Sequence, residues 1–257
     1  MTFKLIDTHC HIDFADFDED RDQVIQTARE AQVSDIIVPA VTYQTWQRTY
    51  NICTQYAQCH LALGLHPIFI DEHQPQHLSA LTKAIEQHSP IAVGEIGLDF
   101  YLSDQQLNRE KQILFFTKQL IIAKQHDLPV IIHNRKAHDE CIQLIAKHKL
   151  KGGIIHAFNG SIQQAKRYIE LDFLLGFGGM LTYQRSRKLR GLLKALPIES
   201  IVLETDAPDM TVEQHRGQRN SPEYIPYILE SVSQISGIEQ SVIAKITSEN
   251  VQQLFAI

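Results

Sequence analysis

The stretch LPVIIH, residues 128–133, is a short apolar run, rich in β-branched residues, that ends on a histidine. A run of this length and composition is typical of a strand buried on both faces of a sheet. Seven similar runs recur along the chain, at residues 4–9, 35–41, 60–66, 91–97, 152–158, 172–178 and 200–206. The segments between them carry apolar residues at three- and four-residue spacing, which predicts helices with one buried face.

Buried strands that alternate with amphipathic helices predict a parallel sheet covered by helices. Eight such strand–helix units in 257 residues match a TIM (β/α)8 barrel of the α/β class. No linker or shift in composition divides the chain, so we predict a single domain over residues 1–257, with closing helices near 221–236 and 239–255. An open doubly wound sheet is the alternative, but no glycine-rich nucleotide-binding motif follows the first strand.

The longest predicted helix, residues 107–126, shows the expected packing pattern. Its apolar residues recur at helical spacing and predict one buried stripe. The members of this stripe are Leu107, Ile113, Leu114, Phe116, Leu120, Ile121 and Ala123.

The composition is that of an ordinary globular protein, with 44% hydrophobic and 21% charged residues. No apolar run approaches the roughly 18 residues of a membrane span, and no signal peptide precedes the first strand. We therefore expect a cytoplasmic protein without a membrane partner, and a monomer. The four cysteines form no CxxC pair and are predicted to be reduced, packed as small apolar groups. The formal charge of −6 argues against a general nucleic-acid-binding coat.

A barrel of this type places its chemical residues at the carboxyl ends of several strands. Singly, a histidine or carboxylate at such a position is often only a hydrogen-bonded side chain or a helix cap. Several crowded at one barrel mouth would be costly to bury, and bound cations would relieve that cost. The sequence therefore predicts a metal site. The strand-end residues are His9, His11, His66, Glu95, His133, His156 and Asp206.

The first of these strands runs into the stretch IDTHCHID, residues 6–13. Side chains alternate along a strand, which would put Asp7, His9 and His11 on one face and Cys10 on the other. Taken alone, the two histidines could equally be polar residues on a wet strand face. Asp7 and Glu204 each stand two residues before a candidate ligand, where a hydrogen bond to a ligand imidazole is expected.

Six motifs carry a resemblance to a known family: DTHCHID, GLHP, GEIGLDFY, IIHNR, HAFNGS and ETDAPD, in this order. The chain resembles the TatD-type metal-dependent hydrolases, a barrel family related to the amidohydrolases and known for deoxyribonucleases. The segments APDM and GQRNSPEY, residues 207–210 and 217–224, resemble one branch of this family. The resemblance covers the chain from end to end.

This resemblance implies a centre of two divalent ions, Zn²⁺, Mg²⁺ or Mn²⁺. Glu95 would bridge the two ions. His9, His11 and Asp206 would hold one of them, and His133 and His156 the other. His66 would contact the substrate or transfer a proton. Because no cysteine is implied as a ligand, all three metals suit the ligand types.

Two such ions about 3.5 to 4 Å apart can activate water and stabilise the attacking and leaving oxygens of a phosphate ester. Asp206 can hold a metal and also accept the proton of the attacking water, with a ligand-only role as the alternative. Glu95 and His66 complete the expected catalytic set.

Several basic residues follow strands that lead to the expected site. Arg135, two residues beyond His133, is the best candidate for a contact with substrate phosphate. Phe100, Tyr101 and Phe158 could stack on a base or simply pack against loops. For Arg187, Lys188 and Arg190 the solvated face of a helix is the favoured alternative. The further cations are Lys136, Arg185, Arg187, Lys188, Arg190, Lys194, Arg216 and Arg219.

These features predict a metal-dependent hydrolase, and the family resemblance implies a deoxyribonuclease or phosphodiesterase of the 3′–5′ exonuclease type acting on DNA ends. One alternative is hydrolysis of another ester or amide, such as the ester of a misacylated tRNA, at the same centre. The other is a non-catalytic metal- or nucleic-acid-binding protein. Glu95 stands where some relatives carry a modified lysine, which favours phosphodiesters.

Overall fold

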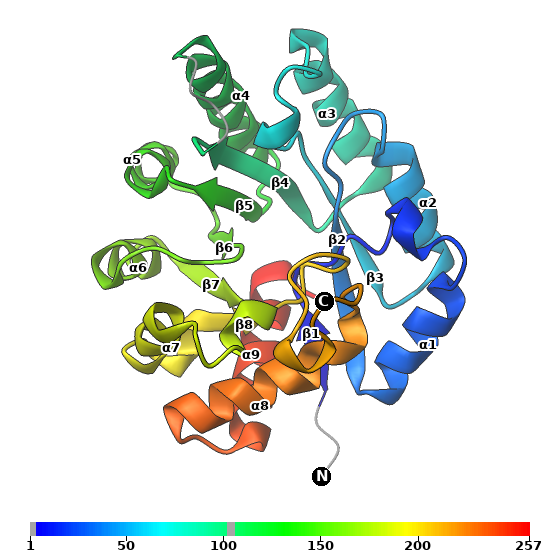
Figure 1. The fold of residues 1–257 in the computed structure, drawn as a ribbon. Helices are drawn as coiled ribbons and strands as arrows, with labels where there is room; N and C mark the ends of the chain where they lie inside the picture. The colour runs from blue at the N-terminus through cyan, green and yellow to red at the C-terminus, as the bar shows by residue number, and fades with distance from the viewer. Residues whose placement is uncertain (1–3, 102–105) are drawn as a thin grey trace. The chain divides into compact units, whose positions relative to one another are not determined.

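The computed structural model describes residues 4–101 and 106–257 (Figure 1). The sheet has eight strands, in the order β1 to β8, and the fold is an α/β barrel of parallel strands, as expected. All eight predicted strands are confirmed, with ends that move by a few residues. The strands are β1 Leu5–Asp7, β2 Val33–Pro39, β3 Cys59–Leu63, β4 Ala92–Asp99, β5 Val130–Arg135, β6 Gly153–Ile155, β7 Phe173–Phe177 and β8 Ile201–Leu203.

Helices follow the strands along the chain, and within the described residues no helix is long and apolar enough to cross a membrane. The predicted closing helices are confirmed, although residues 222–224 form a separate 3₁₀ turn before the first of them. The helices are α1 Arg21–Glu30, α2 Trp46–Gln55, α3 Pro75–His88, α4 Gln106–Gln125, α5 His138–His148, α6 Ile162–Ile169, α7 Arg187–Lys194, α8 Ile225–Ser236 and α9 Gln240–Phe255.

The chain divides into two compact units, which are described separately. Unit 1 consists of the described residues up to Val38 together with Ala157–Ile162 and Leu175–Ile257, and it contains β1, β8 and the larger parts of β2 and β7. Unit 2 consists of Pro39–His156 and Gln163–Leu174, and it contains β3 to β6. The single domain over residues 1–257 stays a prediction.

In unit 1 the first and last strands of the barrel are neighbours. The backbone N–H of Thr8 donates to the carbonyl oxygen of Leu203 at 3.0 Å, and that of His11 donates to Ala207 at 2.8 Å. β2 pairs with the other edge of β1, β7 pairs with β8, and α9 packs on both β1 and β8. The residues that follow β1 and β8 are therefore held side by side.

In unit 2 the central feature is β4, a strand of eight residues that are all buried. Gly97 in β4 has φ +141°, and a Cβ at this position would lie 2.0 Å from the carbonyl oxygen of His133 in β5. Only glycine permits so close an approach of the two backbones. This approach brings the carboxyl ends of β4 and β5 together.

The predicted buried stripe of α4 is wrong in part. Leu114 is 51% exposed, and the side chain of Leu107 lies outside the described residues. The buried face instead includes two glutamines, Gln112 and Gln119. Each side-chain amide pairs with both the N–H and the C=O of one backbone residue, Gln112 with Asp99 and Gln119 with Leu65. These paired hydrogen bonds offset the cost of burying the amides.

Candidate metal centre

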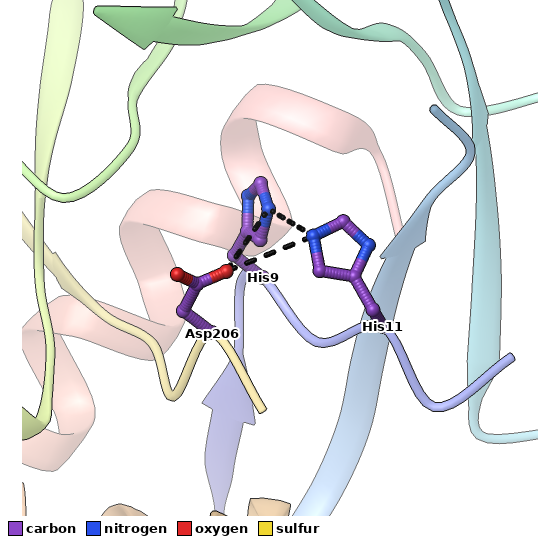
Figure 2. A group of neighbouring side chains, drawn as sticks. All are labelled: His9, His11 and Asp206. Atoms are coloured by element: carbon purple, nitrogen blue, oxygen red, sulfur yellow. Dashed lines mark hydrogen bonds and ion pairs between the residues drawn. The ribbon is translucent and has the colours of Figure 1, made fainter. Parts of the chain in front are cut away.

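Unit 1 brings together three of the expected ligands. The Nε2 atoms of His9 and His11 lie 3.2 Å apart, and each lies 3.7 Å from Oδ1 of Asp206. Figure 2 shows the three side chains pointing toward one another, with the histidines beyond β1 and the aspartate beyond β8. Both imidazoles are buried. Two imidazole nitrogens and a carboxylate oxygen converging in this way suit a divalent cation such as Zn²⁺ or Mn²⁺.

The backbone fixes the spacing of these ligands. The N–H of Asp206 donates to the carbonyl oxygen of His9 at 2.8 Å, and a parallel bridge joins Cys10 to Ala207. Asp206 has φ +60°, a left-handed conformation that is uncommon for a residue other than glycine. This conformation must be maintained by the contacts of the loop.

Two buried acidic side chains support the loops around the ligands. Asp7 accepts hydrogen bonds from the backbone N–H groups of His9 and Thr205, at 3.2 and 2.9 Å, and from the Thr205 hydroxyl. Burial raises the pKa of the Asp7 carboxyl to about 8. Glu204 accepts the N–H of Ala157 at 2.6 Å. Both side chains therefore hold the main chain beside ligand residues.

Unit 2 brings together His66, Glu95 and His133. Oε1 of Glu95 lies 3.3 Å from Nε2 of His66 and 3.3 Å from Nδ1 of His133. Glu95 belongs to β4 and His133 to β5, whereas His66 follows β3. The carboxylate is 2% exposed, so its negative charge is removed from water and is stabilised by these imidazoles. The three atoms lie within 4.8 Å of one another, so an ion held by Glu95 and His133 would lie beside His66.

The hydrogen bonds of His66 fix the tautomer of a neutral ring. Its Nδ1 accepts the N–H of Ile68 at 3.1 Å, so the ring hydrogen is on Nε2, which faces Glu95. A nitrogen that carries hydrogen cannot ligate a metal at the same time. In this state His66 is a hydrogen-bond donor, which agrees with its expected place outside the six ligands.

His133 is oriented by a second carboxylate, Asp99. Oδ2 of Asp99 lies 3.1 Å from Nε2 of His133, and Oδ1 accepts the N–H of Tyr101 at 2.9 Å. Burial lowers the pKa of His133, but hydrogen bonds with Asp99 and Glu95 outweigh it, so the pKa lies above its usual value. Burial acts to raise the pKa of Asp99, and the interaction with His133 reverses the shift. Asp99 both orients a candidate ligand and turns the chain.

His156, the sixth expected ligand, is buried just beyond β6 in unit 2. Its backbone N–H donates to the carbonyl oxygen of Ile132 in β5 at 2.9 Å. His156 therefore lies beside the strand that carries His133. The positive charge of a protonated His156 would act to lower the pKa of His133 by electrostatic repulsion.

Cys10 is buried, and none of the ligand groups found among residues 4–101 and 106–257 includes it. Cys10→Ala should therefore retain most of the parent activity, whereas His11→Ala should lose metal and rate together. Metal content and initial rates of the two purified variants check this. Metal loss in Cys10→Ala comparable to that in His11→Ala would show that the thiolate is a ligand.

Arg135 is exposed at the end of β5, two residues beyond His133. Its guanidinium carbon lies 3.7 Å from the centre of the Tyr101 ring, and Lys136 lies 4.5 Å from the same ring. Tyr101 is 48% exposed, whereas Phe158 is buried and serves packing. A surface of two cations and one aromatic ring thus lies at the ends of β4 and β5.

Two other candidate cations already have partners. Nη1 of Arg190 donates to the carbonyl oxygen of Leu181 at 3.0 Å. The two Nη atoms of Arg219 pair with the two carboxylate oxygens of Asp20, at 2.9 and 2.6 Å. The exposed cations on and beside α7 are Arg185, Arg187, Lys188 and Lys194, which fits the solvated-helix alternative.

The sequence interpretation missed Asn220, a fully buried residue beside the Asp206 loop. Its amide nitrogen donates to the carbonyl oxygens of Thr205 and Asp209. One sign of it in the sequence is that the segment GQRNSPEY, residues 217–224, begins with polar residues and has no apolar side chain before Pro222.

Comparison with known proteins gives consistent matches over the full length. A family model described as TatD related DNase matches residues 6–256. The chain is 38% identical over 260 residues to the uncharacterized metal-dependent hydrolase YjjV of Escherichia coli K12, covering 100% of both chains. The crystal structure of that TatD homologue matches with a TM-score of 0.95 over 100% of both chains. Identity to the 3′-5′ ssDNA/RNA exonuclease TatD of Escherichia fergusonii is 30% over 261 residues, 98% of this chain and 99% of that protein.

Proposed function

Because the chain belongs to the family of TatD related DNases, a family of metal-dependent hydrolases, we propose that it is a nuclease that trims single-stranded DNA from the 3′ end. The observation that carries the proposal is the convergence of His9, His11 and Asp206 in unit 1, and of Glu95 and His133 in unit 2. These residues belong to the ligand set that the family resemblance implies. The exonuclease name of one full-length relative supports the choice of substrate.

The residues present fit divalent cations, since each group offers imidazole nitrogens together with carboxylate oxygen in a buried setting. His9, His11 and Asp206 would hold one ion, and His133 and His156 together with Glu95 the other. Bound there, the ions supply activation of water and neutralisation of phosphate charge.

Asp206 is proposed to accept a proton and His66 to contact the substrate. The Asp206 side chain is 17% exposed, so one of its oxygens can accept a proton from the attacking water. With Glu95 holding a metal ion, the Nε2–H of His66 would donate a hydrogen bond to the substrate. Arg135 would bind a phosphate oxygen pair, with Tyr101 keeping its guanidinium plane in place.

A substrate panel tests the proposed function. Bis-nitrophenyl phosphate, 3′-labelled and 5′-labelled single-stranded DNA, an aryl ester, an aryl amide and an aminoacylated tRNA are each incubated with the protein and Mg²⁺, Mn²⁺ or Zn²⁺. We expect turnover of the phosphodiesters, with early release of the 3′ label and progressive shortening of 5′-labelled DNA. The His133→Ala variant, prepared in parallel, excludes a contaminating nuclease.

Preferential cleavage of the aryl ester or the aminoacylated tRNA would reject the nuclease proposal and support the ester-hydrolase alternative. Binding of metal or DNA without any turnover would support a non-catalytic binding protein. A cytoplasmic location and a monomeric state stay predictions from the sequence.

A further inference from the structure

Asn220 makes four hydrogen bonds around the loop that carries Asp206. Its Nδ2 donates to the carbonyl oxygen of Thr205 at 2.8 Å and to that of Asp209 at 2.7 Å. Its Oδ1 accepts the N–H of Ser221 at 2.9 Å, and its own N–H donates to Pro208 at 2.9 Å. The side chain is fully buried, so water does not compete for these bonds.

The two carbonyl groups that Asn220 binds stand on either side of Asp206. Thr205 precedes it directly, and Asp209 closes a turn by donating its N–H to the Asp206 carbonyl at 2.9 Å. Asp206 itself has φ +60°, so the turn depends on contacts from outside it to keep this backbone conformation. The amide of Asn220 supplies such contacts at both ends of the turn.

Only an asparagine-like side chain fits this position. An amide presents two N–H donors on one nitrogen and an acceptor oxygen on the other side, which is what two carbonyl groups and one backbone N–H require. Aspartate has the same shape, but its carboxylate oxygen would face two carbonyl oxygens at the distances of 2.8 and 2.7 Å that the amide nitrogen now occupies. An alanine would leave both carbonyl groups without this donor.

We propose that Asn220 is a positioning residue for metal binding: by fixing the turn from Thr205 to Asp209 it holds the Asp206 carboxylate against His9 and His11. The proposal rests on the proposed function, in which these three side chains hold one divalent ion. Asn220 acts through the backbone and touches neither the substrate nor the metal. Its loss should therefore weaken one metal site and leave the site of Glu95 and His133 unchanged.

The same segment provides a matched control in Arg219. This residue ties the segment to Asp20, the residue before α1, by paired bonds, and its guanidinium lies 4.3 Å from the centre of the Phe17 ring. These contacts do not include the Asp206 turn. Arg219→Ala therefore loosens the segment without removing the amide bonds of Asn220.

The experiment uses Asn220→Ala, Asn220→Asp and Arg219→Ala in the full-length protein. Each metal-free variant is titrated calorimetrically with Mn²⁺ alone, and its melting temperature is recorded with and without chelator. For both Asn220 variants we expect one of two Mn²⁺ sites to weaken by about 10- to 100-fold, the scale for residues that orient ligands. The rate should fall at limiting Mn²⁺ and recover with excess Mn²⁺, with KM unchanged. Arg219→Ala should bind both ions as the parent does.

Parent-like affinity at both Mn²⁺ sites in Asn220→Asp would overturn the proposal, and so would equal weakening of the two sites, which indicates a general structural role. If Asn220→Ala does not fold, the near-isosteric Asn220→Asp decides the question. Absence of Mn²⁺ binding in the parent would also overturn it. A parent that binds two ions but cleaves no phosphodiester would reject the nuclease proposal alone and leave the role of Asn220 standing.

Discussion

Removal of divalent metal is expected to abolish hydrolysis by this protein, and addition of Mg²⁺, Mn²⁺ or Zn²⁺ should restore it. Ions held by the histidines and carboxylates of the two ligand groups would contribute several kcal/mol of charge stabilisation in the transition state. Since about 1.4 kcal/mol corresponds to a tenfold change, the rate should fall by about 10³-fold or more. Elemental analysis after gentle purification should find up to two ions per chain.

The control for this experiment is the Asp206→Asn variant, which keeps the size of the side chain but removes its charge. It should retain the fold while losing metal from the group with His9 and His11, and added metal should restore little of its rate. Full activity of the parent in a rigorously metal-free sample would contradict the proposed mechanism.

Arg135→Ala should lower kcat/KM for a phosphodiester by about 30- to 1000-fold, or about 2 to 4 kcal/mol of transition-state stabilisation. The guanidinium is exposed beside the end of β5 and lies close enough over Tyr101 to be held there while its donors face phosphate oxygens. Metal content should not change. Parallel rates with single-stranded DNA and with a neutral aryl ester measure the effect, which should be much smaller for the ester.

Two variants make this measurement specific. Arg135→Lys keeps the charge but not the paired donors, so it should recover only part of the rate. Lys188→Ala removes an exposed cation of α7 and should change kcat/KM little. If Arg135→Ala cleaves DNA as well as the parent does, Arg135 has no phosphate role, and the exposed cations of α7 become the next candidates.

The strands could be predicted because each is a short apolar run, and the composition of such a run is enough to indicate a buried strand. The longest helix was harder, because its buried face includes Gln112 and Gln119. A glutamine becomes compatible with burial only when particular backbone groups lie opposite it, and those groups belong to residues far along the chain, as with Gln119 and Leu65. Periodicity in one segment does not contain that information.

The candidate site likewise has features that could be predicted from the sequence and features that could not. His9, His11 and Asp206 could be predicted from their places at strand ends, and the structure brings them together. The tautomer of His66 depends on the N–H of Ile68, and the position of Asn220 beside the Asp206 loop depends on the carbonyl groups of Thr205 and Asp209. Both depend on hydrogen bonds formed only in the folded chain, which residue type and spacing do not specify.

The adjacency of β1 and β8 has a consequence for biosynthesis. The hydrogen bond from Thr205 to Asp7 spans 198 residues, and His9 and Asp206 are almost as far apart in sequence. During translation the two histidines leave the ribosome long before their carboxylate partner, and contacts of such long range form late in folding. A nascent chain therefore cannot assemble this group of three candidate ligands until Asp206, which follows β8, has been synthesised.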